Sequence, residues 1–272
     1  MQRIRSYGIQ LLLNFMLQFL RIFSLNISLY DFFGYFGAFS LVVFNFIQLK
    51  NDGFASGFSR SLIKGRESDR KIFISLKVAE TLLFSIFQYA ILSMFIVEPF
   101  QLMFDNKGVA YFAIVFFAPL VFIIGSFLMR AKPMKYLDLL TPAFPLALCF
   151  SKIGCFCLGC CGGFKTETFG VFNVLDYAKE FPVQLVESAE ALVIFFILLK
   201  LRKNAKLGTM FPFYIMLYGG MRFFSEFLRI EPDVFGPFKF AHLFCVIAFV
   251  LGVIEYFIAK RYAQKVDSLF HS

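Results

Sequence analysis

The sequence predicts an all-α polytopic membrane protein with about seven transmembrane helices. Three observations predict this class. First, 59% of the 272 residues are hydrophobic and 17% are charged, whereas soluble domains are about half apolar and about a quarter charged. Second, seven segments are apolar over nearly the length that crosses a bilayer, about 20 residues. Third, Lys and Arg concentrate in alternate connecting segments, as they do in cytoplasmic loops.

The apolar segments divide the chain into one transmembrane domain, 26–259, with a short segment on either side. Residues 1–25 are expected to form an interfacial segment, because their apolar run is short and has no small-residue cleavage site. An extra span at this end is the alternative. Residues 260–272 are expected to form a cytoplasmic tail. The seven predicted spans, of which the fourth and fifth are the shortest, are 26–49, 72–97, 108–129, 137–156, 183–199, 209–228 and 238–259.

The distribution of basic residues predicts the orientation of the spans. Most Lys and Arg residues follow the first, third, fifth and seventh spans, while the other connecting segments hold Lys107, Lys165, Lys179, Arg229 and Lys239. The positive-inside rule then places the N-terminus outside and the C-terminus in the cytoplasm. The net charge of +9 is explained by cytoplasmic loops, so nucleic-acid binding is not expected. A small outer-face loop domain, 157–182, is expected between the fourth and fifth spans.

The predicted sixth span carries charged residues at membrane depth. Tyr218, Arg222, Glu226 and Arg229 recur at spacings of three and four, so they share one helix face. The planar fork of arginine suits a phosphate, which makes a phospholipid headgroup a natural partner. An Arg222–Glu226 ion pair that only fixes packing, and an Arg229 that only reaches to the interface, are the alternatives. Residues 219–220 are both glycine, which would let another backbone approach.

The fifth and fourth spans supply further polar residues. Gln184 and Glu187 share a face near the outer end of the fifth span, and Glu190 is expected to lie deeper and off that face. Glu187 is interpreted as a base, as a residue that orients an arginine, or as an interfacial carboxylate. In the fourth span, Asp138 suits the start of a helix, where the macrodipole favours a carboxylate. Lys152, near its other end, must pair, reach the interface or bind an anion.

Four of the six cysteines lie in a stretch that closes the fourth span and also contains four glycines. The pattern C-x-C-x-x-C-C is a weak metal signal, because structural zinc sites combine two separated pairs of ligands. An outer location would also permit disulfides or redox chemistry. We prefer a third interpretation, small residues in a tight turn whose N–H groups face an anion. The residues concerned are Cys155, Cys157, Cys160 and Cys161, with Gly154, Gly159, Gly162 and Gly163.

Three motifs together resemble the prolipoprotein diacylglyceryl transferase family. The first is the glycine- and cysteine-rich turn that closes the fourth span. The second is the Pro-x-Gln-Leu-x-Glu motif that begins at Pro182, and the third is the Tyr-Gly-x-x-Arg-x-x-x-Glu-Phe-x-Arg motif that begins at Tyr218. The resemblance is clearest from Asp138 to Arg229 and extends weakly to the first span.

This resemblance implies a reaction, its partners and its site. Diacylglyceryl from phosphatidylglycerol would pass to the lipobox cysteine thiol of a prolipoprotein signal peptide, giving a thioether and glycerol phosphate in the bacterial cytoplasmic (inner) membrane. No cofactor and no metal ligand are implied. The expected catalytic residues are Arg222, Glu226 and Glu187. The expected substrate-binding residues are Lys152, Arg229, Tyr218, Gln184, Gly154, Gly162, Gly163, Cys155 and Asp138.

The chain departs from the family pattern where acid and base groups are expected. Lys152 and Cys155 stand where the family has Arg and Asn, and residues 118–120 read Ala-Pro-Leu near its His-Gly-Gly. Phe33, Phe181 and Val186 replace a Tyr, a His and a Tyr of the family. Three alternatives therefore stay open: a divergent paralogue with another acceptor, a membrane protein that binds metals or uses thiols through residues 155–161, and a small-solute transporter.

Overall fold

The computed structural model describes residues 29–51, 110–128, 133–168, 170–173, 177–230 and 233–271, with parts of 79–96. Within these ranges the protein is mostly helical, as predicted. The helices are α2 (Leu29–Asn51), α6 (Ala110–Leu128), α7 (Pro133–Leu140), α8 (Ala143–Leu158), α9 (Val183–Leu201), α10 (Met210–Glu226) and α11 (Phe240–His271). Two antiparallel hairpins join short strands, β1 (Val171–Asn173) with β2 (Ala178–Glu180) and β3 (Asp233–Phe235) with β4 (Phe238–Lys239).

Helices occupy six of the predicted spans, with two differences in their bounds. The predicted span 137–156 is two helices, α7 and α8, separated by a turn at Thr141 and Pro142. Proline has no N–H to continue the helix, and the Thr141 hydroxyl bonds to the carbonyl of Leu137 at 2.7 Å. Helix α11 continues past residue 260. The predicted interfacial segment 1–25 and most of the span 72–97 lie outside the described residues.

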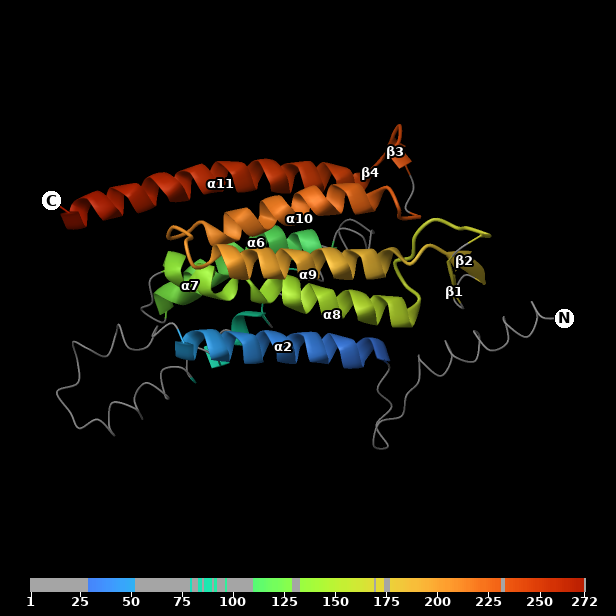
Figure 1. Ribbon diagram of the computed structural model, residues 1–272, viewed down its shortest axis with the longest axis horizontal. Helices are drawn as coiled ribbons and strands as arrows, with labels where there is room; N and C mark the ends of the chain where they lie inside the picture. Colours follow the sequence, from blue (N-terminus) through green and yellow to red (C-terminus); the bar gives the residue numbers. More distant parts are fainter. Residues whose placement is uncertain are drawn as a thin grey trace.

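Among the residues that the structure describes, two helical stretches are long and apolar enough to cross a membrane, Pro133–Leu158 and Phe240–Gln264. In Figure 1 the helices lie side by side along one direction, with α8 and α10 running opposite to α9 and α11. Both hairpins lie at the end where α8 and α10 finish and α9 and α11 begin, which we call the hairpin end. The turn from α9 to α10 lies at the opposite end and contains Arg202, Lys203 and Lys206.

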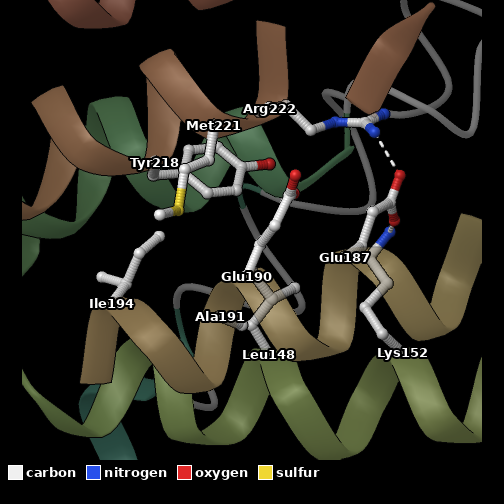
Figure 2. Close-up of a pocket in the computed structure, with 9 residues that line it drawn as sticks. All are labelled: Leu148, Lys152, Glu187, Glu190, Ala191, Ile194, Tyr218, Met221 and Arg222. Carbon is white, nitrogen blue, oxygen red and sulfur yellow. Dashed lines mark hydrogen bonds and ion pairs between the residues drawn. The ribbon is translucent and has the colours of Figure 1, made fainter. Parts of the chain in front are cut away.

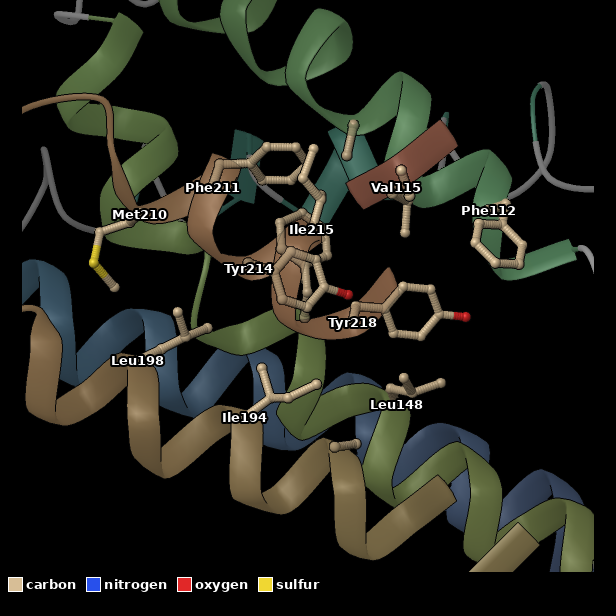
Figure 3. Close-up of a cluster of buried hydrophobic side chains, with 14 of the residues drawn as sticks. Phe112, Val115, Leu148, Ile194, Leu198, Met210, Phe211, Tyr214, Ile215 and Tyr218 are labelled. Atoms are coloured by element: carbon tan, nitrogen blue, oxygen red, sulfur yellow. The ribbon is translucent and has the colours of Figure 1, made fainter. Parts of the chain in front are cut away.

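Aromatic side chains fill the core between α6, α7, α8 and α10 (Figure 3). Several of the tyrosine hydroxyl groups are paired, as buried polar groups generally are. The hydroxyls of Tyr111 and Tyr214 lie 2.7 Å apart, and Tyr136 donates to Gln88 Oε1 at 2.7 Å. The outward face of α11 is instead apolar and exposed, which suits contact with lipid chains. It carries Val246, Phe249, Val250, Ile254, Phe257 and Ile258.

At the hairpin end, the loop after α8 is tied to the ends of two other helices. The N–H of Gly163 donates to the carbonyl of Phe181 at 3.0 Å, and the N–H of Phe164 donates to the carbonyl of Leu228 at 2.9 Å. These bonds join the segment before α9 and the segment after α10 to one loop. We call this contact of three segments the loop junction, because it fixes how α8, α9 and α10 meet beside the charged residues described next.

Candidate functional site

Five charged side chains meet at the hairpin end, with Glu187 of α9 at their centre. Glu187 Oε2 lies 2.5 Å from Lys152 Nζ of α8, and its Oε1 lies 2.8 Å from Arg229 Nη1. The same Oε1 contacts Arg222 of α10. Arg222 also reaches Glu226 Oε2 with its Nη2 atom, at 2.6 Å. We call these five residues the ion cluster.

The ion cluster is buried and has an excess of positive charge. Arg222, Arg229 and Glu187 are each 3% exposed, and Glu226 is fully buried. Each cation contacts a carboxylate, but three cations share two carboxylates, so the cluster carries a net charge of +1. Buried charges require compensation, because low-dielectric surroundings penalise an unpaired ion. The cluster is therefore suited to an anion that brings the missing negative charge.

A pocket opens beside the ion cluster, between α8, α9 and α10 (Figure 2). About 270 Å³ of empty space, part of it open to the surroundings, lies within the pocket, which has two chemically different sides. One side is polar, and the other is formed by aliphatic and thioether groups. This division suits an amphiphile with an anionic group at one end and hydrocarbon at the other. The polar lining is Lys152, Glu187, Glu190, Tyr218 and Arg222, and the apolar lining is Leu148, Ala191, Ile194 and Met221.

The structure brings the predicted arginines together but changes the interpretation of Arg229. This side chain does not extend to an interface; it is buried and points inward to Glu187. Burial by itself would lower the pKa of Arg229, but the adjacent Glu187 carboxylate raises it above its ordinary value. Arg229 therefore stays charged and belongs to the ion cluster.

Glu190 lies in the pocket, so the expectation that it lies off the Glu187 face is wrong. In Figure 2 its carboxylate points from α9 towards the space between Tyr218 and Arg222. The two glutamates are three residues apart, a spacing that places side chains on neighbouring positions of one helix surface. That spacing was the signal in the sequence that could have identified Glu190.

Lys239 is a second residue that the sequence analysis missed. Its Nζ atom donates to the carbonyls of Glu226 at 2.9 Å and Arg229 at 2.5 Å, just beyond the end of α10. The last carbonyls of a helix lack partners within the helix, and a lysine there satisfies them. Lys239 thereby holds the backbone that carries Arg229. Its sequence position, after a turn and at the start of the last predicted span, gives no signal of this role.

Asp138 does not belong to the site, which corrects its predicted role in substrate binding. Its carboxylate accepts bonds from the backbone N–H groups of Gly208 at 2.5 Å and Met210 at 3.0 Å. These groups start α10, at the end of the bundle opposite the hairpins. The start of a helix does favour a carboxylate, but the helix concerned is α10 and not the helix that contains Asp138.

The predicted anion-binding turn at Gly162 and Gly163 is packed against protein. The N–H of Gly163 is engaged in the loop junction, and a Cβ atom on Gly162 would lie 1.9 Å from Glu180 Oε2. Gln184 faces this turn as well, since its Nε2 atom donates to the carbonyl of Cys160 at 2.7 Å. Gly154 is buried within α8. These residues shape the loop beside the ion cluster and do not line the pocket.

Three of the cysteines form a group at the end of α8. The Sγ atoms of Cys155, Cys160 and Cys161 all lie within 4.8 Å of one another, and all three thiols are free. Hydrogen bonds with Cys155 and Cys160 lower the pKa of the Cys161 thiol, and the charges of Lys152 and Arg229 lower it further. The group therefore adjoins the ion cluster.

Comparison with known proteins gives a consistent result. The family model described as "Prolipoprotein diacylglyceryl transferase" matches residues 18–258. Two similar relatives are named "Phosphatidylglycerol--prolipoprotein diacylglyceryl transferase": one from Clostridium tetani, 37% identical over 42% of this chain, and one from Chlorobaculum tepidum, 33% identical over 49%. This chain spans about half the length of both curated relatives, 50% in each case. A similarly named Lactococcus lactis protein is 27% identical, with 68% of this chain and 73% of the relative covered.

Proposed function

Because this chain belongs to the prolipoprotein diacylglyceryl transferase family of polytopic membrane proteins, we propose that it transfers diacylglyceryl from phosphatidylglycerol to the lipobox cysteine of prolipoproteins. One observation carries the proposal: a buried ion cluster with excess positive charge adjoins a pocket with an apolar side. Phosphatidylglycerol has the matching form, an anionic phosphate next to hydrocarbon chains. The setting is the bacterial cytoplasmic membrane, with the hairpin end on its outer side.

The proposed reaction exchanges one bond for another. The bond between the glyceryl carbon and the phosphate oxygen breaks, and a bond between that carbon and the acceptor sulfur forms. The thiol loses its proton, and glycerol phosphate leaves with the bonding electron pair. The lipid phosphate carries one negative charge, while the departing phosphate approaches two. Fixed cations stabilise this added charge in the transition state more than in the bound lipid, which is what accelerates the step.

Arg222 is the residue that we assign to the phosphate. It lines the pocket, and its guanidinium is held between Glu187 and Glu226 on either side. These two carboxylates are engaged with the guanidinium, which suits them to orienting Arg222. Lys152 lines the same pocket and supplies a second cation, so the phosphate would lie between α8 and α10.

We assign the proton of the acceptor thiol to Glu190. Its carboxylate lines the pocket, and no ion pair to it is found among the described residues. A thiol becomes nucleophilic only as the thiolate, so a carboxylate within reach of the acceptor would increase the rate. Replacing Glu190 by Gln preserves its size and removes the base. We expect kcat to fall by about 100-fold or more, the range for loss of a general base, with little change in lipid binding.

The proposed function is tested by direct transfer. Purified protein in phosphatidylglycerol liposomes is incubated with a lipobox peptide, and mass spectrometry measures addition of diacylglyceryl to the cysteine. We expect transfer by the native protein and none by Arg222→Ala. Arg222→Lys should transfer at a reduced rate, because lysine keeps the positive charge but lacks the planar guanidinium that can bond to two phosphate oxygens at once. Lys203→Ala, an exposed change at the opposite end, is the matched control and should transfer normally.

Two results would refute this proposal. Transfer by Arg222→Ala at the native rate would remove Arg222 from the reaction. Absence of transfer by a folded native protein, with several lipobox peptides, would favour a paralogue with another acceptor. Detergent-solubilised yield and the unfolding midpoint of each variant show whether a loss of transfer reflects chemistry or folding.

A further inference from the structure

We propose that Cys155, Cys160 and Cys161 form a binding site for a thiophilic d10 metal ion, with zinc as the reference ion. The inference goes beyond the proposed transfer reaction, which needs no metal. It rests on how the local backbone brings three thiols together.

The end of α8 brings the first two thiols together. Gly159 has φ +80°, and its N–H donates to the carbonyl of Phe156 at 3.1 Å, while the N–H of Cys160 donates to the carbonyl of Cys155 at 3.2 Å. This pair of bonds is the Schellman arrangement of a helix end, in which the residue after the glycine contacts the residue five positions before it. Here both contacting residues are cysteines, so the helix end itself places one thiol beside the other.

The third thiol is positioned by an unfavourable backbone conformation. Cys161 has φ +62°, in the left-handed region that residues with a Cβ atom rarely adopt. Glycine would adopt this conformation without strain, and glycines occupy the next two positions. A requirement for small size alone would therefore favour glycine at 161. The strained cysteine is better explained by a role for its sulfur, which this conformation turns towards Cys155 and Cys160.

The distances among the sulfur atoms suit a metal. In a site with Zn–S bonds of about 2.3 Å, tetrahedral or trigonal angles separate the sulfurs by about 3.8–4.0 Å. The three Sγ atoms here all lie within 4.8 Å of one another. A disulfide would join two of them at about 2.0 Å and leave the third unused. An odd number of mutually close thiols is thus explained by a shared metal and not by a disulfide.

The surroundings would support bound thiolates. The carbonyl of Cys160 accepts a bond from Gln184 Nε2 at 2.7 Å, which fixes the backbone of one ligand to the start of α9. Lys152 interacts favourably with Cys155 and Cys161, and Arg229 interacts favourably with Cys161, so cations offset the charge of the thiolates. Three protein ligands leave a fourth position for water or an added thiol, as in zinc sites that exchange ligands.

Metal content tests this site without reference to transfer activity. The full-length protein is purified under reducing conditions, loaded with zinc and freed of excess ion, and its metal is measured by mass spectrometry. We expect about one zinc ion per chain, and its loss in Cys160→Ser and Cys161→Ser. Cys157→Ser is the matched control, because Cys157 belongs to the same segment but not to the group of three. Cobalt loading should add sulfur-to-cobalt charge-transfer absorption in the native protein and the control only.

Three outcomes would overturn the inference. The first is the absence of metal from the folded native protein, and the second is an equal metal content in the Cys160→Ser, Cys161→Ser and control proteins. The third is a Cys155–Cys160 or Cys155–Cys161 disulfide in protein that was prepared without reductant and with air excluded. The two proposals can fail separately. Transfer by metal-free protein without metal binding would leave the transfer proposal standing and remove this one. Zinc binding without transfer to any peptide would do the reverse.

Discussion

At the scale of single residues, Glu187 organises the ion cluster. One carboxylate from α9 contacts a lysine of α8 and two arginines, one in α10 and one just after it. The spacing of Arg222 and Glu226 in the sequence predicted their i,i+4 pair, which the structure contains. No spacing could predict which cations Glu187 would meet, because these partners come from other segments. We therefore expect the charge of Glu187 to matter both for folding and for the site.

Replacing Glu187 by Gln should destabilise the protein strongly. The change keeps the shape but leaves Lys152, Arg222 and Arg229 without their shared partner, and breaking a buried pair this way costs about 3–5 kcal/mol. Unfolding of the detergent-solubilised protein by denaturant measures the effect. Lys152→Gln is the comparison and should cost less, because the Lys152 side chain is 16% exposed and water can compensate in part. Equal stability of Glu187→Gln and the native protein would show that the ion cluster contributes nothing to folding.

At the scale of elements, α10 and α11 pack closely at Gly219 of α10. A Cβ atom on Gly219 would lie 2.8 Å from the carbonyl oxygen of Cys245 and 3.1 Å from the amide nitrogen of Phe249. Nothing lies within 4 Å of the same position on Gly220. Both glycines were expected to allow a close approach, but only Gly219 does so. The rotation of α10 about its axis decides which of two adjacent residues faces α11.

This difference gives a matched pair of variants. Gly219→Ala should lower the thermal unfolding midpoint, because its methyl group meets backbone atoms of α11 that cannot move independently. Gly220→Ala should leave the midpoint unchanged or raise it, since alanine favours helix by about 1 kcal/mol over glycine. A scan of both variants in one detergent measures the difference. Similar midpoints would contradict the close approach of α10 and α11.

The loop junction makes a comparable prediction for the hairpin end. A Cβ atom on Gly163 would lie 2.6 Å from the carbonyl oxygen of Phe181 and 2.7 Å from that of Leu228. Gly163→Ala should therefore separate the three segments and expose the loop 159–182 to limited proteolysis. Gly34→Ala, with no atom within 4 Å, is the control and should be cut at the native rate. An unchanged cleavage pattern in Gly163→Ala would mean that the junction is not what orders this loop.

At the scale of the whole molecule, charged groups and helix directions divide the bundle into two different ends. The ion cluster, the cysteines and both hairpins share one end, and the turn with Arg202, Lys203 and Lys206 lies at the other. The positive-inside rule assigns that turn to the cytoplasm. The substrates of the proposed reaction, a membrane lipid and an exported protein, would then meet the ion cluster from the outer side.

Protease accessibility tests this orientation. A short cleavage sequence is inserted after Tyr177, which is 77% exposed in the β1–β2 turn, or after Asn204, which is exposed between α9 and α10. Protease added to spheroplasts should cut the first insertion and spare the second, and inverted membrane vesicles should show the opposite pattern. Each insertion controls for the other. Cleavage of the Asn204 insertion in intact spheroplasts would reverse the predicted topology.

The sequence by itself determined the mostly helical class, the approximate positions of the described helices and the charged face of α10. These features follow from apolar length and from spacings of three and four, which act within one helix. Only the tertiary structure decided that Asp138 caps another helix, that Arg229 turns inward, that Glu190 enters the pocket and that Cys161 joins Cys155 and Cys160. Three of these outcomes depend on how helices rotate and pack against distant segments, and the fourth depends on a strained backbone angle that residue identity does not reveal.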